Sequence, residues 1–122
     1  MNTIIKTERK YDLEERSLAF AKNVRAFVKI LPRSVANTED IKQLVRASGS
    51  IGANYIEANE ALGKKDFLMR IRISRKEAKE SRYWLDLIDI GSIQGAEQTR
   101  KELFQAATEL MMILSSIMRK SM

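Results

Sequence analysis

The 122-residue sequence contains no cysteine and no histidine. Without cysteine the chain has no disulfide and no thiolate nucleophile, which suits a reducing compartment. Without histidine it lacks the commonest general base and the commonest metal ligand. We therefore expect no enzymatic activity, no metal and no cofactor. A bare Asp/Glu nuclease site is the least implausible enzymatic alternative.

Long apolar runs are also missing. The first ten residues, MNTIIKTERK, contain no stretch suited to a signal peptide. The longest mostly apolar stretch without charge, Leu110 to Met118, is far shorter than the roughly 20 residues that span a bilayer. We expect a single soluble domain in the cytoplasm with no membrane partner.

Apolar residues recur at alternating spacings of four and three, which is typical of amphipathic helices. The pattern predicts helices over about residues 12–31, 38–62, 64–90 and 96–119. Pro32 should end the first helix, and Thr38 is a good N-cap for the second. The core stripe of the second helix runs from Ile41 to Leu62. Four such helices with short connections predict an all-α, antiparallel up-down-up-down four-helix bundle.

The few glycines include two in the middle of the second predicted helix, Gly49 and Gly52. Each costs about 1 kcal/mol relative to alanine within a helix. We expect one continuous helix in which this cost allows close approach by a neighbouring helix. The alternative is a break into two short helices.

Positive charge is concentrated in the third predicted helix. Between Lys64 and Arg82 there are eight cations and three carboxylates, so this stretch carries +5 of the chain's net +6. On a helix that turns 100° per residue, seven cations fall within about 120° of arc. Tyr83 lies in the same arc, where it can stack on a base or cover the surface. The seven cations are Lys64, Lys65, Arg72, Arg75, Lys76, Lys79 and Arg82.

This basic arc has two interpretations. Cations on one helix face can contact the phosphates of RNA or DNA. They can also form a solvated face whose carboxylate partners come from another helix or another subunit. Few amide side chains accompany them, so the nucleic-acid interpretation implies recognition of charge and shape rather than of bases.

A polar stripe on the second helix lies opposite its apolar stripe. We interpret it as pairing with the third helix or with a neighbouring subunit, because its carboxylates have no histidine or nucleophile beside them. The stripe consists of Arg46, Ser50, Asn54, Glu57 and Glu60.

A second apolar strip on the third helix lies about 100° or more from the core stripe of that helix. One bundle cannot easily bury both strips, so we expect the second to mediate self-association. The alternative is a wide core contacted by two neighbouring helices. The strip consists of Met69, Ile73, Trp84 and Leu87.

The stretches RASGSIGANYIEANEALGKKDF (46–67) and RISRKEAKESRYWLDLI (72–88) resemble the four-helix-bundle proteins of the 23S rRNA intervening-sequence family. The similarity covers nearly the whole chain, and the pattern of the two central helices is its specific part. The family is related to the accessory variability determinant of diversity-generating retroelements, a basic pentameric bundle that binds nucleic acid and a reverse transcriptase.

The resemblance implies a homo-oligomer, with a pentameric ring as the candidate form, and no enzymatic activity. It also implies nucleic acid as a partner and a reverse transcriptase as a candidate protein partner. In one departure, Glu57 is followed by Ala-Asn-Glu-Ala rather than by an early glycine, which suggests a longer second helix. The resemblance implies that the polar matching positions, including Glu77 and Glu80 of the third helix, organise the bundle and its subunit contacts. The positions that match the family are Arg46, Ser50, Asn54, Glu57, Lys65, Asp66, Phe67, Arg75, Glu77 and Glu80.

Together these features favour a non-catalytic, homo-oligomeric bundle that binds RNA or DNA through the basic face of its third helix. The alternative is an oligomeric scaffold for protein interactions, in which the basic helix forms ion pairs between subunits.

Overall fold

A computed structural model describes the main chain of residues 2–122 and the side chains of residues 13–122. The segment for which the sequence predicts no signal peptide, residues 1–10, lies outside the described side chains. The chain forms four helices: α1 (Asn2–Val28), α2 (Val35–Asn59), α3 (Lys64–Leu87) and α4 (Ala96–Ser121). No strand occurs in the described main chain, and the all-α prediction is confirmed.

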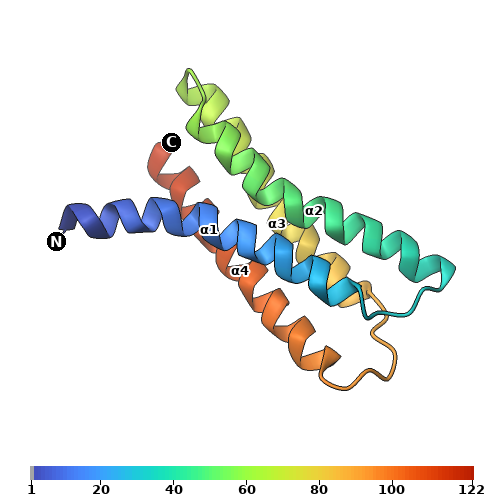
Figure 1. Cartoon of the computed structure of the whole chain (residues 1–122). Helices are drawn as coiled ribbons and strands as arrows, with labels where there is room; N and C mark the ends of the chain where they lie inside the picture. The colour runs from blue at the N-terminus through green and yellow to red at the C-terminus, as the bar shows by residue number, and fades with distance from the viewer. Residues whose placement is uncertain (1) are drawn as a thin grey trace.

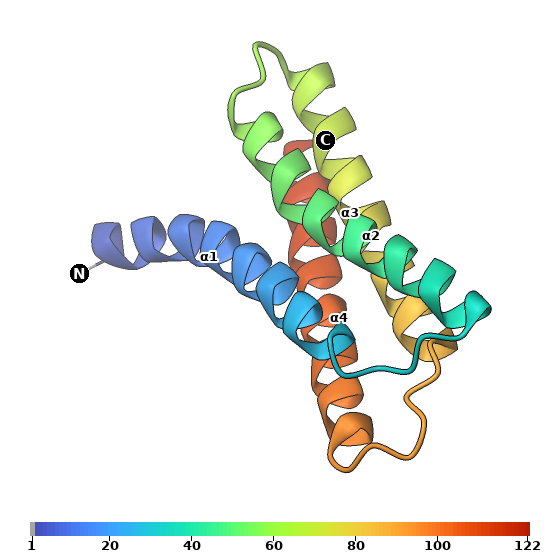
Figure 2. The ribbon, with the colours of Figure 1, turned by 45° about the vertical axis from the view of Figure 1, so that its right-hand side comes forward.

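Each helix of the bundle packs against two others (Figure 1). Helix α2 lies between α1 and α3, and α4 lies between α3 and α1, so α1 and α3 are diagonal neighbours. Consecutive helices run in opposite directions (Figure 1). For α3 and α4, a hydrogen bond from Lys64 Nζ to the main-chain oxygen of Met122 joins the start of one helix to the end of the other. The N-terminal end of α1 leans away from the other helices (Figure 2).

The end of α1 and the start of α2 differ from the sequence prediction. Helix α1 ends at Val28, three residues earlier than predicted, and Leu31 is buried in the turn that follows. Helix α2 begins at Val35, because Ser34 rather than Thr38 is its N-cap. The Ser34 hydroxyl accepts a hydrogen bond from the main-chain N–H of Asn37 at 3.1 Å, which satisfies one of the free donors of the first turn.

Asn37 links the loop before α2 to the loop after α3 through side-chain hydrogen bonds. Its amide donates to the carbonyls of Pro32 at 2.8 Å and Asp89 at 2.9 Å, and its Oδ1 accepts from the N–H of Asp89 at 2.8 Å. The side chain is buried and its polar atoms are paired, so it fixes the start of α2 beside the end of α3.

Helix α1 begins at Asn2, about ten residues before the predicted start, whereas α3 and α4 begin at the predicted residues 64 and 96. Three helix ends also differ. Helix α2 ends at Asn59 rather than running to Leu62, which is fully exposed and not part of the core. Helix α3 ends at Leu87 instead of residue 90, although Ile88 is still buried. Helix α4 continues to Ser121, two residues beyond the prediction.

The predicted apolar stripes otherwise form the core. Buried side chains from all four helices make one cluster, and serines of the stripes are buried with them. Phe67 near the start of α3 and Ile117 near the end of α4 are only half-buried. No helix of the described chain is both long enough and apolar enough to cross a membrane.

The two glycines of α2 lie in one continuous helix, as the sequence predicted. A Cβ at Gly52 would lie 2.9 Å from Ser17 Oγ and 3.4 Å from Ser17 Cβ, so α1 approaches α2 closely there. A Cβ at Gly49 would meet only the guanidinium of Arg25, at 3.3 Å. Because that group ends a flexible side chain, it can move aside.

These environments predict opposite effects of two alanine substitutions. Gly49→Ala should raise the free energy of unfolding by about 0.5–1 kcal/mol through helix propensity. Gly52→Ala should lower it by about 1 kcal/mol, because overpacking against Ser17 outweighs that gain. Urea denaturation measures both changes.

The double variant Ser17→Ala/Gly52→Ala is the control for the cause. Loss of the hydroxyl should restore most of the stability that Gly52→Ala removes. Equal stabilisation by the two glycine substitutions would contradict the close approach of α1 and α2.

Candidate nucleic-acid interface

Helix α3 places most of its cations and two of its four acids on different sides. Glu77 and Glu80 face Arg46 on α2, whereas Asp86 is exposed and shares the basic side by helical spacing. The predicted basic arc faces solvent and α4, and the side chains of Lys64, Lys65, Arg72, Lys76 and Lys79 are exposed. Arg75 and Arg82 are half-buried. The packing against α2 therefore leaves the basic arc on the outer surface of the single chain.

A groove between α3 and α4 brings five of these cations together. It has a volume of about 480 Å³. Its α4 side contributes a thioether and a hydroxyl, and no carboxylate lines it. The lining residues are Arg72, Arg75, Lys76, Lys79, Arg82, Met111 and Ser115. The groove is therefore positive along its α3 wall.

Arg82 is the cation that α4 holds most firmly. Its guanidinium carbon lies 4.6 Å from the centroid of the Phe104 ring, a cation–π contact. Its Nη1 donates to Met111 Sδ at 3.5 Å, while its Nε is buried without a hydrogen-bond partner. These contacts restrict Arg82, whereas the lysines of the groove stay exposed.

The end of α4 extends the positive surface beyond the groove. Lys64 at the start of α3 contacts the main chain of Met122. Arg119 and Lys120 in the last turn of α4 are exposed near this contact. These two cations were not predicted from the sequence, although antiparallel pairing of the last two helices would place the last turn of α4 beside Lys64.

None of the seven predicted cations forms an ion pair with a carboxylate side chain among residues 13–122. The described ion pairs use cations outside the arc, such as Arg46, Lys42 and Arg100. Within one chain, the charge of the basic arc is thus not neutralised by direct pairing.

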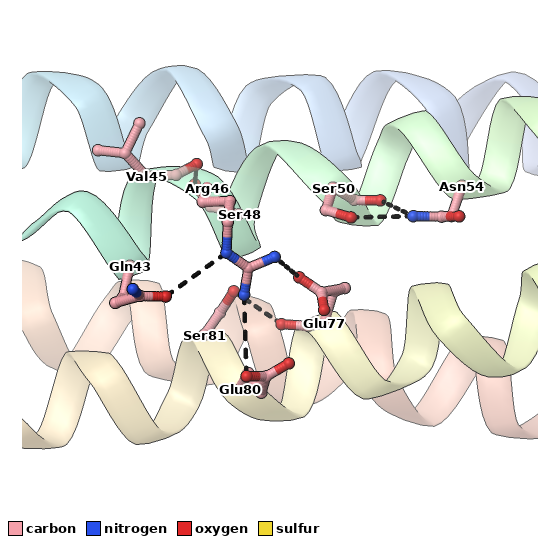
Figure 3. Close-up of polar contacts among 9 residues, drawn as sticks. All are labelled: Gln43, Val45, Arg46, Ser48, Ser50, Asn54, Glu77, Glu80 and Ser81. Carbon is pink, nitrogen blue, oxygen red and sulfur yellow. Dashed lines mark hydrogen bonds and ion pairs between the residues drawn. The ribbon is translucent and has the colours of Figure 1, made fainter. Parts of the chain in front are cut away.

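The predicted polar contacts fall into two groups between α2 and α3 (Figure 3). In the first, Arg46 Nη1 lies 3.1 Å from Glu77 Oε2 and its Nη2 lies 3.8 Å from Glu80 Oε1. Arg46 Nε also donates to Gln43 Oε1 at 3.5 Å. Ser81 supports the cluster from within the bundle, because its hydroxyl donates to the carbonyl of Glu77 at 2.9 Å.

In the second group, the Asn54 amide donates to the Ser50 hydroxyl at 2.9 Å and to the Ser50 carbonyl at 3.0 Å. Asn54 Oδ1 accepts from Arg70 Nη1 on α3 at 3.3 Å. Glu57, which the sequence placed with these residues, is exposed and joins neither group. The described contacts therefore lie between helices of one bundle.

Burial raises the pKa of Glu77, and the hydrogen bond to the neighbouring carboxyl of Glu80 raises it further. The positive charge of Arg46 acts in the opposite direction but does not cancel the rise. Glu77 is therefore a buried carboxyl whose ionisation opposes folding. Because Glu77 is buried where α2 packs against α3, we assign it a structural role.

The second apolar strip of α3 is only partly exposed. Met69 is 47% exposed and Leu87 is 50% exposed. Ile73 is half-buried, and Trp84 packs against the core. One bundle thus accommodates much of the strip, and the two outer side chains remain as an exposed apolar surface.

Among the residues whose side chains are described, no group of three or more acidic, histidine or cysteine side chains could hold a metal ion.

Comparison with known proteins agrees with the fold. Residues 9–116 match the model of the family described as 23S rRNA-intervening sequence protein. A crystal structure of a protein of unknown function from the S23 ribosomal protein family of Bacteroides thetaiotaomicron is similar, with a TM-score of 0.72 and 33% identity. The match covers 87% of this chain and 97% of that one. No curated protein sequence matches the chain significantly.

The environment of Glu77 predicts a pH-dependent effect of Glu77→Gln. Because folding raises the pKa of this group above its ordinary value of 4.5, ionisation costs the wild type stability as the pH rises through and above that value. The glutamine cannot ionise, and its carbonyl can still accept from Arg46. We expect the variant to gain stability relative to the wild type between about pH 4 and about pH 7.

Urea unfolding at a series of pH values measures this difference. Glu39→Gln, at the exposed pair with Lys42, is the matched control, since exposed pairs contribute less than about 1 kcal/mol. A constant difference between Glu77→Gln and the wild type over this range would contradict the assigned environment of Glu77.

Proposed function

The chain belongs to the family of 23S rRNA-intervening sequence proteins, and we propose that it is a non-catalytic, cytoplasmic protein that assembles as a homo-oligomer and binds nucleic acid. The binding surface is the basic arc of α3 together with the groove that it forms with α4. RNA and DNA both offer the phosphate chemistry that this surface suits.

The observation that carries the proposal is the unneutralised charge of the basic arc. Seven cations share one side of α3, and none forms an ion pair with a carboxylate side chain within residues 13–122. Two of the four acids of the same helix, Glu77 and Glu80, are paired with Arg46 on the other side. Close like charges destabilise a helix slightly, and contact with phosphates removes that repulsion.

The lining of the groove favours contact with the nucleic-acid backbone. Arginine and lysine supply five of its seven residues, and neither asparagine nor glutamine is among them. Amide side chains read base edges by paired hydrogen bonds, whereas cations contact phosphates without regard to sequence. The proposed binding is therefore weakly sequence-specific and sensitive to salt.

Self-association is proposed on the exposed apolar side chains of Met69 and Leu87, with Ile73 and Trp84 behind them. The relatives named in the sequence analysis suggest a pentameric ring, with a reverse transcriptase as a candidate partner. A scaffold is the rival function, in which the basic arc pairs with acidic residues of a neighbouring subunit.

The test is the triple variant Arg72→Glu/Arg75→Glu/Lys79→Glu. It should weaken binding to a structured RNA or a DNA duplex by about 100-fold or more, because each position changes from attraction to repulsion. Its helicity and oligomer mass should not change. Fluorescence anisotropy, circular dichroism and light scattering measure these three properties.

The matched control is Lys22→Glu/Lys29→Glu/Arg33→Glu, whose positions are exposed and lie on or just after α1. Each triple reversal changes the charge by −6, so both variants have a net charge of 0 instead of +6. Equal loss of binding in both variants would show only a net-charge effect. Dissociation of the oligomer by the α3 variant would favour the scaffold instead.

A further inference from the structure

Tyr83 is an exposed aromatic residue on the basic side of α3. It is 59% exposed, compared with 47% for Met69 and 50% for Leu87 on the same helix. It lies four residues after Lys79 and seven after Lys76, so all three side chains share one helix face. An aromatic ring in this position provides an uncharged surface among cations.

The ring of Tyr83 packs against a neighbouring aromatic side chain. It contacts Trp84 with a centroid separation of 5.0 Å and an interplanar angle of 81°. Trp84 itself packs against the hydrophobic core, so it gives the exposed ring a fixed neighbour. No described side chain forms a hydrogen bond with the Tyr83 hydroxyl. The ring contacts within residues 13–122 include no parallel-stacked partner for Tyr83.

The basic arc is also straight over a considerable length. From Lys64 to Arg82 the helix rises about 27 Å at 1.5 Å per residue. A B-form duplex makes roughly three-quarters of a turn over that length, so each of its strands winds away from a straight row of cations. A single strand can extend along the row and turn its bases toward the protein.

We infer that the preferred ligand is single-stranded nucleic acid, with a base stacked on Tyr83 and the adjoining phosphates held by Lys76, Lys79 and the three arginines of the groove. Stacking on an aromatic ring is available to every base, and it combines with a cationic row in proteins that bind single strands without sequence preference. This inference rests on the proposed function and specifies its ligand.

The test compares a short unstructured RNA strand with the same strand annealed to its complement. The wild type should bind the single strand more tightly. Tyr83→Leu, which keeps an apolar side chain but removes the aromatic ring, should weaken single-strand binding about fivefold to 100-fold and leave duplex binding unchanged. Tyr83→Phe should retain single-strand binding, because the ring remains.

Leu18→Ala is the matched control, because Leu18 is 56% exposed and lies on α1, diagonal to α3. It should bind both ligands as the wild type does. Preference for the duplex, or wild-type affinity of Tyr83→Leu for the single strand, would overturn the inference. If the α3 charge reversal still abolished binding in that case, the proposed function would stand. Absence of binding to either ligand would overturn both.

Discussion

The packing of α3 between α2 and α4 determines which of its charges are paired. Arg46 on α2 forms ion pairs with Glu77 and Glu80 on the side of α3 that faces α2, where Glu77 is buried. The cations on the opposite side meet an α4 surface that offers a ring, a thioether and a hydroxyl but no carboxylate in the groove. One set of interhelical contacts thus pairs two of the four acids of α3, whereas none of the seven cations of the basic arc pairs with a carboxylate side chain among residues 13–122.

The rest of the bundle holds α3 in this orientation. Ser74 on α3 donates to the carbonyl of Ile51 at 2.7 Å inside the core, and buried Asn37 fixes the loop that follows α3. On the other side of α2, Gly52 lets α1 approach closely enough to cover the core. Small and polar residues in the stripes therefore set the distances between helices, while the larger apolar residues fill the space between them.

Much of this fold follows from periodicity in the sequence. Stripes at a spacing of four and three predicted the buried residues well, because a helix must bury one continuous face. Helix ends were less predictable. Ser34 and Thr38 are both good capping residues, and only the turn shows that Ser34 is used. Leu62 continued the pattern by spacing but lies beyond the end of α2. The basic arc was visible on one helix, whereas the contribution of Arg119 and Lys120 depends on how α4 pairs with α3.

The measurement that tests the central claim most directly is the salt dependence of the affinity for single-stranded RNA. If the five groove cations contact phosphates, the slope of log affinity against log salt concentration should be about −3 to −4, at about 0.7 per contact. Such a slope would show that the basic arc is available to a polyanion in the assembled protein. A slope near zero, or no binding at low salt, would contradict the account, because the cations would then be neutralised within the assembly.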